Sequence, residues 1–189
     1  MPISPELQTF TTAPQSLINY NYRDLFNKTG FVIYYLAITN IDRGEGDVVE
    51  YILTEHQVEG HQSTSGFGMT GSTTYDGSPL PQAATLKGIA TFSGQIKYGS
   101  GTDAISCSLW HVTSDGVTET QIGETVSGTT NSSGRPFNLA VEVEETRFAV
   151  GEYFRLKVTA SGNYYSADPS EIRPDTNSSK LRIPFKLDI

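Results

Sequence analysis

Apolar and polar residues alternate along several short segments of this chain, which is typical of strands with one face in a core. In the last nine residues, Leu181–Ile189, every odd-numbered residue is apolar. The even-numbered residues, which would point to the opposite face, are Arg182, Pro184, Lys186 and Asp188. Pro184 has no N–H for a sheet ladder, so we expect this strand at a sheet edge or with a bulge there. The segments 137–144 and 153–159 alternate in the same way, and their apolar residues are predicted to point into the core.

Other segments predict further strands. Phe31–Ile38 is a continuous apolar and aromatic run, which favours a central strand buried on both faces or nearly so. Residues 48–54, 86–98, 104–113 and 117–126 are also predicted strands, and Ser114-Asp115-Gly116 indicates a hairpin turn. About eight strands with many turns predict an all-β fold, an antiparallel β-sandwich of jelly-roll-like topology.

Two segments lack strand periodicity. Residues 1–20 are polar and contain three prolines, so they predict an extended N-terminal arm, followed by a single domain over residues 21–189. Residues 59–81 are rich in glycine, serine and threonine, which indicates a long loop. A loop of this length is either a functional contact loop or a surface excursion without a role, and the sequence leaves both open.

Composition limits the classes of function. The 21 acidic and 13 basic residues give a net charge of -8, which opposes the phosphate neutralisation that nucleic-acid binding needs. Cys107 is the only cysteine, so the chain has no disulfide framework, and its strand phase predicts a buried thiol. A basic leader and a long apolar run are both missing, so we expect synthesis in a cytoplasm and no membrane segment.

The residues that could carry chemistry form no convincing constellation. The three histidines, His56, His61 and His111, lack matching ligands, and His111 fits a strand residue near a sheet margin. Asp42, Glu45 and Asp47 could approach a calcium ion, although a solvated acidic turn explains them better. The carboxylate pairs are Glu144 with Glu145 and Glu119 with Glu124, and strand carboxylates usually face solvent. We therefore predict a non-enzyme without a metal ion or other cofactor.

Tyrosine and phenylalanine are the residue types that suggest a function. The chain has 10 Tyr and 9 Phe, and exposed tyrosine is a common contact residue because it covers much area with little rotamer entropy to lose. Tyr34 and Tyr35 are better explained as core residues. The predicted contact residues are Leu7, Phe10, Leu17, Tyr20, Tyr22, Phe67, Tyr75, Tyr164 and Tyr165.

Three stretches together resemble small virion structural proteins of tailed bacteriophages. They are Tyr22-Arg-Asp24 leading to 29–35, Phe148-Ala-Val-Gly-Glu-Tyr-Phe-Arg-Leu-Lys-Val158, and the terminal strand 181–189. The resemblance implies a capsid decoration or cement protein, or a tail or neck subunit, found in the virion. Its partners would be the major capsid protein or other virion proteins, and copies of itself, with a trimer expected. The alternative is a carbohydrate-binding or receptor-contacting β-sandwich module that uses exposed tyrosines and Trp110.

Overall fold

The computed structural model describes residues 29–42, 47–55, 71–98, 103–130, 136–161, 163–164 and 179–186. Within these ranges every regular element is a β-strand, so the predicted all-β class is confirmed. The strands are β1 (Thr29–Asp42), β2 (Asp47–Thr54), β3 (Gly71–Gly77), β4 (Ala84–Tyr98), β5 (Asp103–Val112), β6 (Glu119–Gln121), β7 (Val126–Thr130), β8 (Pro136–Phe148), β9 (Tyr153–Ala160), β10 (Asn163–Tyr164) and β11 (Lys180–Lys186). Among these residues no helix has the length and hydrophobicity of a membrane span.

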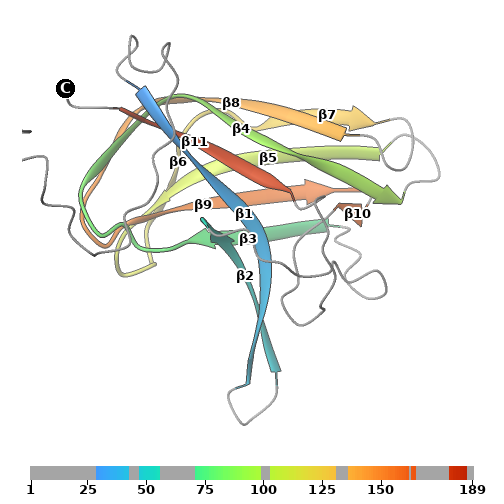
Figure 1. Cartoon of the computed structure of the whole chain (residues 1–189), viewed down its shortest axis with the longest axis horizontal. Helices are drawn as coiled ribbons and strands as arrows, with labels where there is room; N and C mark the ends of the chain where they lie inside the picture. The colour runs from blue at the N-terminus through green and yellow to red at the C-terminus, as the bar shows by residue number, and fades with distance from the viewer. Residues whose placement is uncertain are drawn as a thin grey trace, which may run out of the picture.

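The strands form one strongly curled sheet that folds over its own core. Its order is β10-β4-β11-β1-β2-β3-β9-β5-β6, with β8 paired to β4 and β7 paired to β5. In Figure 1, β1 runs obliquely across the other strands, and the far end of the β1–β2 hairpin projects away from them. The described pairs are antiparallel except β2–β3, which is parallel, so the sandwich is mixed where an antiparallel one was predicted. The jelly-roll topology stays a prediction.

The core lies inside the curl and takes one face of each long strand. Burial alternates residue by residue along β8 from Pro136 to Glu144 and along β9 from Tyr153 to Val158, as the sequence pattern predicts. Aromatic pairs hold the strands together: Tyr34 of β1 meets Phe154 of β9 edge to face at 4.7 Å, and Phe92 of β4 meets Phe137 of β8 at 4.9 Å. Cys107 is buried in this core, and burial raises the pKa of its thiol to about 12.

The C-terminal strand lies inside the sheet. β11 pairs with β1 on one side and β4 on the other, so the expectation of an edge strand is wrong. The alternative, a bulge at Pro184, is confirmed, because the register against β4 shifts between Arg182 and Phe185. The missing N–H of the proline is therefore accommodated by a local irregularity. Leu181 and Ile183 are buried, as the alternation predicts.

The predicted loop 59–81 is wrong for its last part, because Gly71–Gly77 form β3. This strand pairs with β9 along most of its length and presents Ser72, Thr74 and Asp76 outward. Only Tyr75 supplies a large apolar side chain, and that side chain is fully buried. A strand with one large core residue has no clear alternation, so its partner β9 decides its conformation.

The predicted strand 117–126 is also wrong in its extent. The hairpin turn at Ser114–Gly116 is confirmed, since the amide of Gly116 donates to the carbonyl of Thr113 at 2.9 Å. The Asp115 carboxylate extends the turn by accepting from the amide of Val117 at 3.0 Å. Two short strands follow, β6 and β7, separated at Gly123, whose φ of 89° is outside the range of a strand.

Candidate functional site

The outer face of β1, β11 and β4 carries an unusual set of side chains. Because Val32, Tyr34 and Leu36 point into the core, Phe31, Ile33 and Tyr35 of β1 point outward, where they are half-buried. The register places Arg182 of β11 beside Ile33, and Lys180 beside Tyr35. We call Phe31, Ile33, Tyr35, Ile89, Lys180 and Arg182 the aromatic face. The continuous apolar run of β1 thus reflects one face in the core and a second, partly covered face on the surface.

Two cations lie over the rings of the aromatic face. The guanidinium carbon of Arg182 is 3.5 Å from the ring centroid of Phe31, and Nζ of Lys180 is 5.8 Å from that of Tyr35. Within the described part of the chain, neither cation is among the residues that form ion pairs. Nearby on β4, Ile89 is 62% exposed. The surface is therefore apolar and positively charged, on a chain whose net charge is -8.

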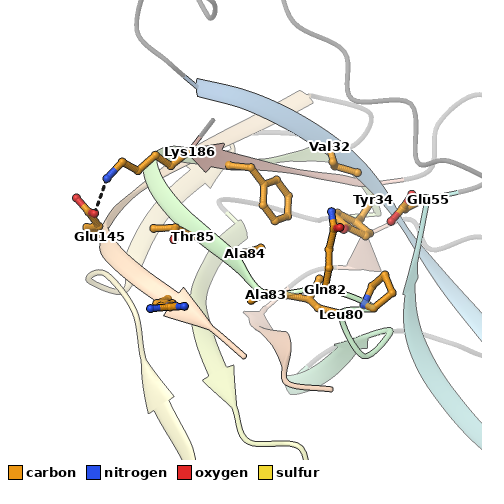
Figure 2. Close-up of a pocket in the computed structure, with 13 residues that line it drawn as sticks. Val32, Tyr34, Glu55, Leu80, Gln82, Ala83, Ala84, Thr85, Glu145 and Lys186 are labelled. Carbon is orange, nitrogen blue, oxygen red and sulfur yellow. Dashed lines mark hydrogen bonds and ion pairs between the residues drawn. The ribbon is translucent and has the colours of Figure 1, made fainter. Parts of the chain in front are cut away.

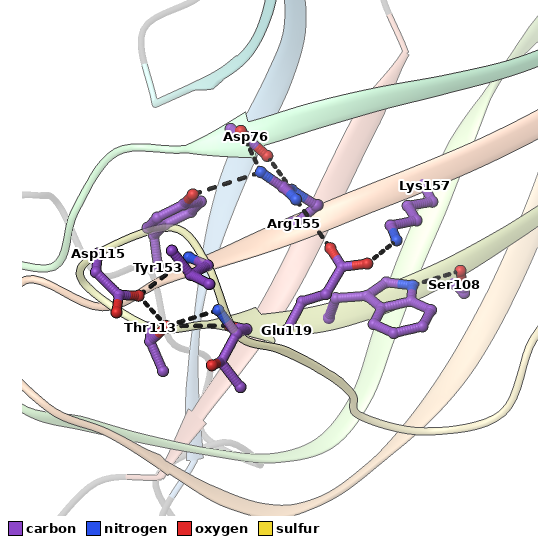
Figure 3. Close-up of polar contacts among 11 residues, drawn as sticks. Asp76, Ser108, Thr113, Asp115, Glu119, Tyr153, Arg155 and Lys157 are labelled. Carbon is purple, nitrogen blue, oxygen red and sulfur yellow. Dashed lines mark hydrogen bonds and ion pairs between the residues drawn. The ribbon is translucent and has the colours of Figure 1, made fainter.

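The outer face of β3, β9, β5 and β6 is different, because its charges neutralise one another (Figure 3). Arg155 donates to both carboxylate oxygens of Asp76, at 2.5 and 2.8 Å, and to Glu119 at 2.8 Å. Lys157 pairs with the same Glu119. These two cations lower the pKa of Glu119, and Asp76 raises the pKa of Arg155. Glu119 is thus held ionised in a structural ion-pair network, which does not suit a proton donor.

Trp110 lies in the same network. Its indole N–H donates to the hydroxyl of Ser108 at 2.9 Å, and Nζ of Lys157 is 3.9 Å from the ring centroid. A sugar that stacks on an aromatic platform needs an open ring face. Lys157 occupies one face of this ring, so Trp110 is a poorer platform than the sequence alone indicates.

A pocket of about 750 Å³ opens where the ends of β1, β4, β8 and β11 approach the segment 80–83. Apolar side chains line part of it, among them Val32, Leu80 and Phe185. Figure 2 shows Glu55, Tyr34 and Gln82 at one end and Glu145 with Lys186 at the other. Burial, with the nearby carboxylate of Glu55, raises the pKa of Tyr34. The pocket is therefore an apolar hollow with a charged rim.

Glu145 joins two lysines at the rim of the pocket. It accepts from Lys186 at 2.7 Å and from Lys87 at 2.9 Å, and these contacts lower its pKa from 4.5 to about 2. Like Glu119, it is fully ionised near neutral pH. Its partners come from β4 and β11, so the ion pairs connect three strands.

We expect Glu145→Gln to lower stability in a manner that depends on pH. A carboxylate whose folded pKa lies below its unfolded one stabilises the fold above pH 4.5, and this contribution disappears as the pH falls through about 2. Urea unfolding of both proteins from pH 6 downward should show a gap that closes near pH 2. Glu144→Gln, which removes an exposed carboxylate from the same strand, is the control. A gap that stays constant over this pH range would contradict the assignment.

The structure places few of the contact residues predicted from the sequence. Tyr75 is a correction: its side chain is 0% exposed and meets Tyr51 edge to face, so it belongs to the core. The backbone of Tyr164 lies in β10, while its side chain is outside the described set. The remaining predicted contact residues, and the arm itself, lie outside the described residues: Leu7, Phe10, Leu17, Tyr20, Tyr22, Phe67 and Tyr165.

Some of the histidines and acidic residues considered as metal ligands lie in the described strands. In the described residues no group of three His, Cys, Asp or Glu could hold a metal ion. The backbones of Asp42 and Asp47 lie opposite each other in the β1–β2 hairpin, while Glu45, His56 and His61 lie outside the described residues. His111 lies in β5, where its Nε2 is 2.8 Å from a carboxylate oxygen of Glu152 and its ring packs on Phe148. The aromatic face was missed, although outward apolar residues in the run 31–35 were a signal for it.

Comparison with known proteins supports the fold and no more. No protein-family model matches the chain, and no curated protein matches its sequence. A CocE/NonD family hydrolase from Staphylococcus aureus is structurally similar over 84% of this chain and 37% of its own, with 10% identity and a TM-score of 0.51. At this identity the likeness concerns the fold alone.

Two further solved structures have TM-scores too low to carry an argument. An aminopeptidase from a marine sediment archaeon, Thaumarchaeota archaeon, has 8% identity and a TM-score of 0.48, over 85% of this chain and 35% of its own. The CBM22-2 xylan-binding domain from Paenibacillus barcinonensis has 12% identity and a TM-score of 0.29, over 82% and 88%. The chain spans little more than a third of the hydrolase and of the aminopeptidase.

Proposed function

We propose that this protein is a non-catalytic structural protein that works through protein–protein contacts, with the aromatic face as its main contact surface. The observation that carries this proposal is the outward row of Phe31, Ile33 and Tyr35 under the cations Arg182 and Lys180. Aromatic residues and arginine are enriched in protein interfaces and dominate their binding energy. A partner surface with apolar side chains and carboxylates complements this face.

The rest of the fold supports the same role by making the contact surface rigid. β1 and β11 are neighbours in the interior of the sheet, and their inward residues Val32, Tyr34, Leu181 and Ile183 belong to the main core. Binding to a preorganised surface loses less conformational entropy than binding to a loop. The aromatic face is therefore suited to a permanent or symmetric contact.

The setting that we propose is a bacteriophage particle, on the strength of the sequence resemblance. In this setting the protein is made in the host cytoplasm and becomes a capsid decoration or cement protein, or a tail or neck subunit. Its partners are then the major capsid protein and further copies of itself, and many weak contacts add up through multivalency. The chain as a whole is acidic, whereas the aromatic face carries the positive charges of Arg182 and Lys180. This contrast in charge can direct the association of the face with an acidic partner surface.

The double variant Arg182→Glu with Ile89→Asp tests the contact role. Both residues are exposed, so we expect the fold to remain intact while self-association weakens about tenfold or more. Light scattering after size-exclusion chromatography, over a range of concentrations, measures the change. Val117→Asp is the control, because Val117 is 80% exposed on the β5–β6 turn, away from the aromatic face. Equal association of the double variant and the wild type would contradict the proposal.

A glycan array with the wild-type protein separates this proposal from the carbohydrate-binding alternative. We expect no glycan binding on the array, together with self-association that depends on Arg182 and Ile89. Glycan binding that is lost in Trp110→Ala and retained in the double variant would favour the alternative instead.

A further inference from the structure

The pocket lined by the ends of β1, β4, β8 and β11 has a buried floor and an exposed rim. Val32 and Tyr34 at the floor are only 8% and 4% exposed, and Leu80 and Phe185 pack against the same core. Gln82 is exposed and marks the rim. A concave hollow of about 750 Å³ with an apolar floor has the size of a small-molecule site. Its shape therefore suits a compact ligand with an apolar body better than a flat protein surface.

The walls of this pocket are fixed by the backbone. The amide of Leu80 donates to the carbonyl of Glu152 at 2.9 Å, and the amide of Gly151 donates to the carbonyl of Leu80 at 2.9 Å. Val32 and Phe185 belong to β1 and β11, which pair with each other in the sheet. Because these walls are already in place, a ligand that enters the pocket orders few further groups on binding.

Arg147 is a cation of the pocket lining that has no neutralising partner in the described part of the chain. It lies on β8 opposite Thr85 of β4 and shortly after Glu145, so these three residues belong to the same end of the pocket. Glu145 already accepts from Lys87 at 2.9 Å and from Lys186 at 2.7 Å. Arg147 is exposed and takes part in none of the ion pairs among the described residues. This end of the pocket therefore has an excess of positive charge.

The opposite end of the pocket carries a negative charge. Figure 2 shows Glu55 beside Tyr34 at that end, away from Glu145 and Lys186. A carboxylate group is repelled by Glu55 and attracted to the end with Arg147. A guanidinium also matches a carboxylate in shape, because it can donate two parallel hydrogen bonds to it. The charges of the rim thus favour a ligand with one anionic group and set its orientation.

We propose that this pocket binds a small amphiphilic carboxylate, with its apolar body on Val32, Leu80 and Phe185 and its carboxylate on Arg147. The site goes beyond the contact role proposed above. It uses the inward residues of β1, whereas the aromatic face uses the outward ones, so the protein can bind a small ligand and a partner surface at the same time.

Isothermal titration calorimetry of the full-length chain with octanoate, 1-octanol and octyltrimethylammonium tests the proposal. The three probes share one alkyl chain and differ in the charge of the head group, and octanoate is expected to bind most tightly. Arg147→Gln should weaken octanoate binding about fivefold, because it removes a partly solvated ion pair with charge-assisted hydrogen bonds. The same variant should leave octanol binding unchanged, since an alcohol has no charge for Arg147 to attract.

A second variant tests whether the ligand lies in the hollow. Ala83 is exposed at the rim, so Ala83→Trp should fill the pocket and abolish binding of both octanoate and octanol without disturbing the core. Val117→Trp is the matched control, because Val117 is 80% exposed on the β5–β6 turn. Far-UV circular dichroism of each variant shows whether the β-fold is retained, so that unfolding is not mistaken for loss of the site.

The proposal is supported if octanoate binding is lost in Ala83→Trp, retained in Val117→Trp and selectively weakened in Arg147→Gln. Absence of octanoate binding to the wild type would overturn it, as would tighter binding of octyltrimethylammonium or equal weakening of octanoate and octanol by Arg147→Gln. Binding that is lost in Arg182→Gln and kept in Arg147→Gln would place the ligand on the aromatic face and overturn it too. Because self-association is measured separately, either proposal can fail without the other.

Discussion

Replacing Phe154 by alanine is expected to destabilise the fold by about 3–5 kcal/mol. Phe154 is 0% exposed on β9, and its ring meets Tyr34 of β1 at 4.7 Å, so it joins strands from different parts of the curled sheet. Its surroundings are tightly packed: a Cβ added at Gly77 would lie 3.0 Å from Cζ of this ring. Because the backbone lies this close to the ring, the surrounding residues can move little into the space that the ring vacates. The cavity left by the substitution should therefore persist.

Urea unfolding followed by tryptophan fluorescence measures this loss, since Trp110 on β5 reports on the fold. Phe31→Ala is the matched control: it removes the same side chain from the half-buried aromatic face, where about 1 kcal/mol is expected. Equal losses for the two variants would mean that Phe154 does not hold the core together in the way the structure indicates.

Replacing Gly123 by alanine is expected to cost about 2–4 kcal/mol, from backbone strain and steric overlap together. Gly123 has a φ of 89°, which L-residues with a side chain rarely adopt. A Cβ at this position would overlap the carbonyl oxygen of Glu142 on β8 and lie 2.9 Å from Cγ1 of Val141. The β6–β7 connection approaches β8 this closely only because residue 123 has no side chain.

Gly116→Ala separates the two contributions. Gly116 also has a positive φ, 73°, but a Cβ there would meet its nearest neighbour, the hydroxyl of Tyr153, at an ordinary 3.4 Å. It should therefore lose only the conformational part, about 1 kcal/mol. The difference between the two variants in urea unfolding measures the overlap with β8. A difference near zero would show that the connection moves away from β8 at little cost.

The sequence predicts most strands correctly where a strand has a buried side and an exposed side. Along β8 and β9 the alternation identifies the core residues one by one, since the side-chain period of a strand is two. It fails for β3, because Tyr75 is the only large residue on the inward face of that strand. It fails also for 117–126, where the interruption at Gly123 depends on contact with β8, a segment remote in sequence.

The sequence did not locate the candidate contact surface. An excess of tyrosine and phenylalanine indicates contact residues, yet the sequence pointed to Tyr75, which is in the core. The aromatic face combines β1 with β11, whose residues Phe31 and Arg182 are far apart in the chain. A pattern read along one segment contains no information on which distant strand will become its neighbour.

By itself the sequence determined that this protein is built from strands, that its charge is acidic, and which face of β8 and β9 is buried, because these properties depend on local periodicity and composition. Only the tertiary structure decided the order of the strands, the parallel pairing of β2 with β3, the choice between an edge and a bulge at Pro184, and the position of cations over the rings of β1. The physical reason is that sheet pairing joins residues through space, so the environment of each side chain depends on strands that the local sequence does not specify.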